Sequence, residues 1–138
     1  PTPTYLGGNF TVSATTTNTD SAGLTYSVVS GPCALVSGAT FSSSGAGTCK
    51  VQASGAVTTN YLAASAQQDV TIAKAPTTTA VSAPGAVQYS DKVNLSATVS
   101  AASLSGLTGS VEFFMNGTSQ GSSPINTSGV ATLSPQVL

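Results

Sequence analysis

The stretch 70–81 divides the chain and limits what it can fold into. At its start, Val70 and Ile72 alternate with polar residues, which is typical of a strand with one buried face. Pro76 then interrupts any strand, because proline has no N–H group and favours extended geometry in the residue before it. A second alternating run follows at once. The sequence therefore predicts two modules, residues 1–75 and residues 76–138.

Apolar and polar residues alternate in short runs along both halves of the chain. Turn signals recur about every 8–12 residues, as in a β-sandwich, and no helical spacing of apolar residues persists. Asn116-Gly117 is the strongest hairpin signal, because both central positions of a type I′ turn need a positive φ. The sequence thus predicts an all-β fold, with strands at 9–15, 24–29, 33–36, 39–41, 48–53, 68–73, 92–99, 111–115 and 129–133.

Charged side chains are too few for several classes of function. The 138 residues include three Lys, four Asp or Glu, and no Arg or His, whereas about 25% charged residues is usual. Three cations cannot follow a phosphate backbone or dock on anionic lipid, so neither nucleic acid nor a membrane surface is expected as a partner. No apolar run approaches the roughly 20 residues of a membrane span. A 40% apolar share with net charge −1 favours a folded chain over disorder.

The two halves also match each other at several positions. Residues 11–15 match 94–98, Tyr26 and Val28 match Val111 and Phe113, and Gly47 and Val51 match Gly129 and Leu133. In this register, the segment from Val57 to Lys74 has no counterpart in the second half. The second module is therefore expected to lack its closing strand or strands within this chain. Such a sandwich has an open apolar groove and unpaired backbone groups.

Cys33 and Cys49 are the only cysteines, and both lie on predicted strands. As a disulfide they would close a loop of about 15 residues, worth roughly 3 kcal/mol from chain entropy. A module of about 70 residues has a small core that benefits from such a link, and small disulfide-bonded domains are typical of secreted proteins. A redox or metal-binding pair is the alternative, although a metal needs more ligands than two thiolates. We predict a structural disulfide in a secreted, extracellular protein.

No arrangement of residues predicts catalysis, a cofactor or a metal. Serines are abundant, but there is no His to activate one. Lys92, Asn94 and Glu112 are the only set that could form a Lys–Asn isopeptide crosslink, and strand alternation turns all three toward solvent. The carboxylates Asp20 and Asp91 are isolated, whereas calcium sites need clustered oxygen ligands. We predict a protein that is not an enzyme and needs no cofactor.

Three aromatic residues are candidate contact residues: Phe114, Tyr61 and Tyr89. Alternation places Phe114 on the face opposite Phe113, so its ring is expected at the surface. Contact with a neighbouring module, contact with another subunit and stacking on a sugar are the three uses open to such rings. An outward Phe with no role at all is also common.

Several motifs resemble immunoglobulin-like repeats of bacterial secreted and cell-surface proteins. In the first half these are residues 8–15, 30–33, 45–49 and 70–75. In the second half, residues 77–79, 95–99, 108–114 and 128–133 resemble a second family of such repeats. The resemblance implies two tandem Ig-like β-sandwich modules of a large adhesin or surface stalk, with no catalytic residues to carry over. The second family's pattern continues into a glycine-led final strand that these 138 residues do not include.

We therefore expect a structural or adhesive spacer in a large extracellular bacterial surface protein. Its partners would be neighbouring Ig-like modules or identical subunits, or a cell-surface or glycan ligand. Two alternatives stay open. One is an extracellular filament in which the extended Pro1–Gly8 segment of one subunit completes the second module of the next by strand donation. The other is a carbohydrate-binding accessory domain of a secreted enzyme.

Overall fold

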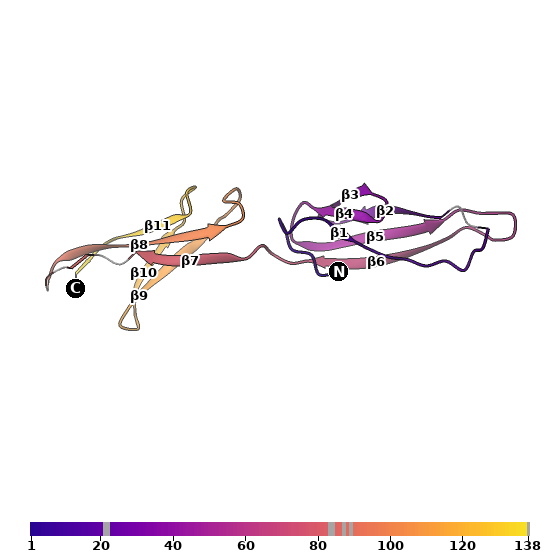
Figure 1. The fold of residues 1–138 in the computed structure, drawn as a ribbon. Helices are drawn as coiled ribbons and strands as arrows, with labels where there is room; N and C mark the ends of the chain where they lie inside the picture. Colours follow the sequence, from indigo (N-terminus) through magenta and orange to yellow (C-terminus); the bar gives the residue numbers. More distant parts are fainter. Residues whose placement is uncertain (21–22, 83–84, 87, 89, 138) are drawn as a thin grey trace. The chain divides into compact units, whose positions relative to one another are not determined.

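In the computed structural model, the chain forms two compact units, Pro1–Ala75 and Pro76–Leu138 (Figure 1). The structure describes residues 1–20, 23–82, 85–86, 88 and 90–137. These residues form eleven strands and no helix. Each unit contains two antiparallel sheets, so the predicted all-β class is confirmed, and the arrangement is consistent with β-sandwich packing.

The first unit has one sheet of order β1-β4-β3 and another of order β2-β5-β6. Its strands are β1 (Phe10–Thr11), β2 (Leu24–Ser30), β3 (Cys33–Ser37), β4 (Thr40–Ser43), β5 (Gly47–Gly55) and β6 (Ala64–Ile72). An isolated parallel bridge joins Thr4 to Ala73, just after β6. The N–H of Tyr5 donates to the carbonyl of Ala73 over 2.8 Å, and the N–H of Ala73 donates to the carbonyl of Pro3 over 2.9 Å.

The core of the first unit draws side chains from both sheets. Phe10 and Phe41 come from β1 and β4, and their rings stack with centroids 5.8 Å apart. Alternation along the other sheet adds the remaining members, namely Cys49, Val51, Val70 and Ile72. Phe41 is fully buried. The two sheets are therefore packed together by apolar side chains, and on β5 and β6 polar residues such as Lys50 and Asp69 occupy alternate positions.

The second unit has a sheet of order β11-β8-β7 and a two-stranded sheet of order β10-β9. Its strands are β7 (Thr77–Ser82), β8 (Lys92–Ala101), β9 (Ser110–Met115), β10 (Thr118–Pro124) and β11 (Val130–Val137). Strict alternation on β8 buries Val93, Leu95, Ala97 and Val99, as the sequence predicts. Phe113 from β9 and Ala131 from β11 complete this core.

The hairpin predicted at Asn116-Gly117 is confirmed. Both residues have positive φ values, 49° and 80°, and they connect β9 to β10 with Met115 opposite Thr118. The strand β10 itself was not predicted, because its sequence is polar and shows no apolar alternation. The hairpin turn, rather than a hydrophobic pattern, sets its pairing.

Two other expectations need correction. The strand predicted at 9–15 is limited to Phe10–Thr11, because pairing with β4 ends after the N–H of Val12 donates to the carbonyl of Ala39. The match of Gly47–Val51 to Gly129–Leu133 is wrong as a structural equivalence. In the structure β5 pairs with β2, whereas β11 pairs with β8. β5 and β11 therefore do not occupy equivalent positions in their sheets. The sequence match of residues 11–15 to 94–98 makes β1 the counterpart of β8. Since β4 pairs with β1 and β11 pairs with β8, β11 corresponds to β4.

Replacing Phe41 with Ala should lower the free energy of unfolding of the first unit by about 3–5 kcal/mol, because it removes a fully buried ring and leaves a cavity. Denaturant titration, monitored by far-UV circular dichroism, measures this change. Leu62→Ala is the matched control, since Leu62 is 89% exposed and its truncation should change stability by no more than about 0.5 kcal/mol. Equal effects of the two variants would contradict this assignment of the core.

Candidate functional site

The disulfide predicted between Cys33 and Cys49 is present, with the two Cα atoms 5.8 Å apart. Cys33 begins β3 in one sheet and Cys49 lies on β5 in the other, so the bond links the two sheets of the first unit. Cys49 is fully buried within the core. A link between sheets restricts the unfolded chain, and it also fixes how the two sheets pack against each other.

Gly31 allows the chain to pass close to β5 beside this disulfide. Its φ is +101°, and its carbonyl accepts a hydrogen bond from the N–H of Cys33 over 2.9 Å. A Cβ atom at this position would overlap the carbonyl oxygen of Thr48 and lie 2.8 Å from the Cα of Cys49. The sequence indicated only a turn at Gly31-Pro32, and it gave no signal of this contact.

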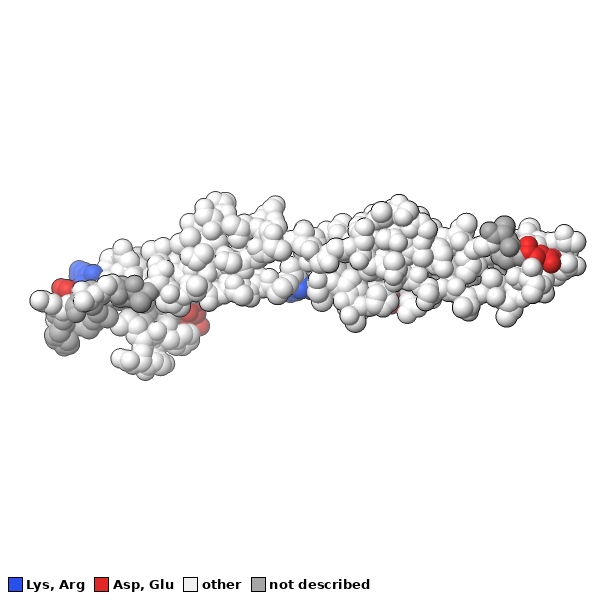
Figure 2. All heavy atoms as spheres, viewed as in Figure 1, with Lys and Arg blue, Asp and Glu red and all other residues white. Residues whose placement is uncertain are grey.

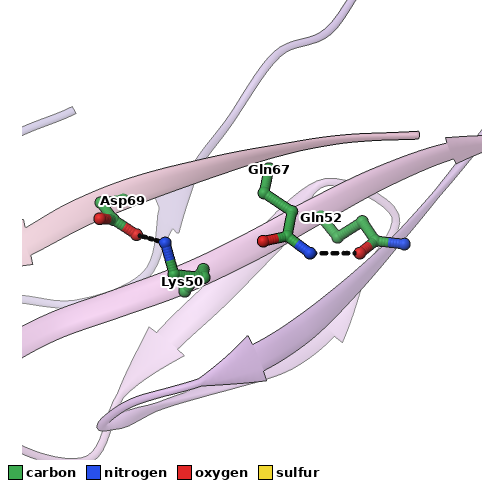
Figure 3. Close-up of polar contacts among 4 residues, drawn as sticks. All are labelled: Lys50, Gln52, Gln67 and Asp69. Atoms are coloured by element: carbon green, nitrogen blue, oxygen red, sulfur yellow. Dashed lines mark hydrogen bonds and ion pairs between the residues drawn. The ribbon is translucent and has the colours of Figure 1, made fainter.

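Two polar pairs cross from β5 to β6 on the face opposite the core (Figure 3). The ammonium group of Lys50 forms an ion pair with the Asp69 carboxylate, and both side chains are substantially exposed. Next to it, Nε2 of Gln67 donates to Oε1 of Gln52 over 2.9 Å. Exposed pairs of this kind contribute at most about 1 kcal/mol each. They help to set the strand register.

The Asp20 carboxylate connects two loops at one end of the first unit. Its Oδ2 accepts hydrogen bonds from the backbone N–H of Asn60 over 3.1 Å and from Nδ2 of Asn60 over 2.8 Å. The Tyr61 hydroxyl lies 3.2 Å from Oγ1 of Thr19, and the Tyr61 carbonyl accepts from the N–H of Thr58. Sequence reasoning treated Asp20 as isolated, because its partners are about forty positions away and only the fold brings them together.

The candidate contact residues fall in different settings. Phe114 is 60% exposed and points away from the core, as alternation predicts. Tyr61 is 38% exposed, and its hydroxyl contacts the loop described above. Tyr89 lies outside the described residues. Binding by any of these side chains stays a prediction.

The described part of the chain brings together no group of three or more His, Cys, Asp or Glu that could hold a metal. Lys92, Asn94 and Glu112 are exposed, and Oε1 of Glu112 accepts a hydrogen bond from the Ser119 hydroxyl over 2.8 Å. Among the described residues, no helix is long and apolar enough to cross a membrane. Figure 2 shows how few charged atoms interrupt the visible surface.

Comparison with protein-family models, with curated proteins and with solved structures found no significant match. A functional proposal therefore rests on the fold and on the residues described above.

Gly31→Ala should destabilise the first unit by about 1–3 kcal/mol more than Gly38→Ala. Both glycines have positive φ, so both substitutions carry the backbone cost, but only the Cβ at Gly31 meets the backbone of β5. At Gly38 nothing lies within 4 Å of the added atom. Thermal or urea unfolding of the two variants in parallel measures the difference. If Gly38→Ala were as damaging as Gly31→Ala, the close approach beside the disulfide would not matter for stability.

Proposed function

We propose that this chain is a non-catalytic structural segment of a large extracellular bacterial surface protein. Its two units act as immunoglobulin-like β-sandwich modules arranged in series, which serve as a spacer or stalk. The observation that carries this proposal is the disulfide between the sheets of the first unit, because it is a device for keeping a small sandwich intact outside the cell.

The nature of the surface supports the same proposal. Only seven residues of 138 are charged, and serine and threonine are abundant. The face drawn in Figure 2 is mostly uncharged. Little net charge gives little repulsion between free molecules in solution. That is a smaller disadvantage for a module tethered within a long surface protein than for a freely diffusing one.

The connection between the units also fits a load-bearing role. β6 ends at Ile72 and β7 begins at Thr77, so only residues 73–76 lie between the last strand of the first unit and the first strand of the second. Pro76 within this link has a fixed φ and cannot donate a backbone hydrogen bond. A short link with a proline extends little under tension, so force passes from one sandwich to the next.

The two alternatives draw less support from the geometry. In the filament alternative, Pro1–Gly8 would be a free donor strand, but Pro3 and Tyr5 are hydrogen-bonded to Ala73 of their own unit. In the carbohydrate-binding alternative, Tyr61 would offer its ring to a sugar, but its hydroxyl and carbonyl are held within the loop. We therefore favour the spacer.

Single-molecule stretching of the chain tests the mechanical role. The residues between Cys33 and Cys49 cannot extend while the disulfide is intact, and their sequence separation is 16. Unfolding of the first unit should therefore release about 50 Å less chain under oxidising conditions than under reducing conditions. The length released by the second unit should not change.

The Cys33→Ser, Cys49→Ser double variant is the control, and it should release the longer length with or without reductant. Extension without any force peak would contradict a load-bearing role for both units. Peaks of equal length in both redox states would show that the disulfide does not shorten the released chain, and would remove the observation on which the proposal rests.

A further inference from the structure

The turn between β9 and β10 is made by the only Asn-Gly sequence of the chain, Asn116-Gly117. It lies at the end of the β9–β10 hairpin, away from the other strands of the second unit (Figure 1), and both of its residues are exposed. Both have the positive φ that the central positions of a type I′ turn require. Met115 and Thr118 are the pair that closes the turn.

Two groups in this turn can react with each other. The side-chain amide of Asn116 and the backbone N–H of Gly117 have no hydrogen-bond partner among the described residues. No other asparagine precedes a glycine. At Asn126, by contrast, Oδ1 accepts hydrogen bonds from the N–H groups of Ser128 and Val130, each over 2.9 Å. Asn116 therefore combines an unbonded side chain with a following residue that has no Cβ to hinder attack.

We propose that Asn116 is a site of spontaneous covalent modification in which the chain itself supplies the nucleophile. The nitrogen of Gly117 attacks Cγ of Asn116, and a new N–Cγ bond forms. The bond from Cγ to Nδ2 breaks, and Nδ2 leaves as ammonia with the proton that the Gly117 nitrogen gives up. The product is a five-membered succinimide ring. Water then opens the ring at either of its two carbonyl carbons, which leaves aspartate or isoaspartate at position 116.

The closed hairpin slows this reaction. A type I′ turn sets the ψ of its first central residue at about +30°, which turns the nitrogen of Gly117 away from the side chain of Asn116. Ring closure needs rotation about this bond, so the turn must open first. Ser119 resists the opening. Its hydroxyl donates to Oε1 of Glu112 on β9 over 2.8 Å, and its Oγ accepts from the N–H of Gly121 over 3.3 Å.

Isoaspartate cannot rebuild the turn. Its main chain runs through Cβ, so the loop is one atom longer and no longer fits a type I′ turn. β10 depends on that turn, because its own sequence is polar and has no apolar alternation. Further along β10, the Ser123 hydroxyl still donates to the carbonyl of Thr132 on β11 over 2.7 Å. The reaction therefore opens the end of the hairpin permanently and leaves the rest of β10 in place. This site does not depend on the spacer role proposed above.

Peptide mapping by mass spectrometry tests the proposal on the full chain, sampled during incubation at mildly alkaline pH. Position 116 should convert before any other asparagine, and isoaspartate should appear there together with aspartate. Asn116→Gly tolerates the positive φ and removes the side-chain amide, so the early release of ammonia should disappear. Direct hydrolysis of the side-chain amide gives no isoaspartate. Aspartate alone at this position, earlier conversion of another asparagine, or early ammonia release from Asn116→Gly would each overturn the proposal.

Ser119→Ala tests whether the hairpin controls the reaction. Conversion should be about two- to tenfold faster, the change expected when one hydrogen bond no longer opposes opening. Ser122→Ala is the matched control, because Ser122 is also exposed on β10 and its hydroxyl has no hydrogen-bond partner within the described part of the chain. Its rate should equal that of the unsubstituted chain.

Hydrogen exchange of the converted chain supplies a second measurement. The amides of Met115 and Thr118 should lose protection, because the turn that pairs them is gone, while the amide of Leu95 on β8 should keep its protection. Equal conversion rates for Ser119→Ala and Ser122→Ala, or unchanged protection of Met115 and Thr118 after conversion to isoaspartate, would overturn the proposal.

Discussion

The Cys33–Cys49 bond is the covalent link on which the packing of the first unit depends, because it joins a three-stranded sheet to the sheet opposite. Cys49 belongs to a small core that also contains Phe41 and Val51. Burial of so few side chains leaves a narrow margin over the entropy cost of ordering the chain. A link worth roughly 3 kcal/mol is a large part of such a margin. Gly31 belongs to the same arrangement, since it lets the backbone approach β5.

The second unit reaches stability by a different route. It relies on the strict alternation of β8, whose inward side chains pack against Phe113 and Ala131. Its smaller sheet has two strands, and Val81 remains exposed at the edge of the core face. A two-stranded sheet gains stability mainly from what it packs against. The two units thus hold a small core by different means, a disulfide between sheets in the first and strict strand alternation in the second.

Strands with alternating apolar residues could be predicted from the sequence, whereas a polar strand that is defined only by its pairing could not. β8 follows from its residue pattern, and the hairpin at Asn116-Gly117 follows from turn chemistry. β10 has neither pattern, so only its partner strand defines it. The cysteine pairing was predictable because only two cysteines exist. The loop contacts of Asp20 and the close approach at Gly31 were not, because both depend on residues distant in sequence.

Residue-resolved hydrogen exchange of the full chain, with and without reductant, tests the central claim most directly. If the two units are separately stabilised and the disulfide supports only the first, reduction should lower the protection of the Val51 amide by about 3 kcal/mol. The amide of Leu95, on β8, should keep its protection. An equal loss at Leu95 would show one cooperative structure, and no loss at Val51 would show that the link between the sheets does not carry their stability.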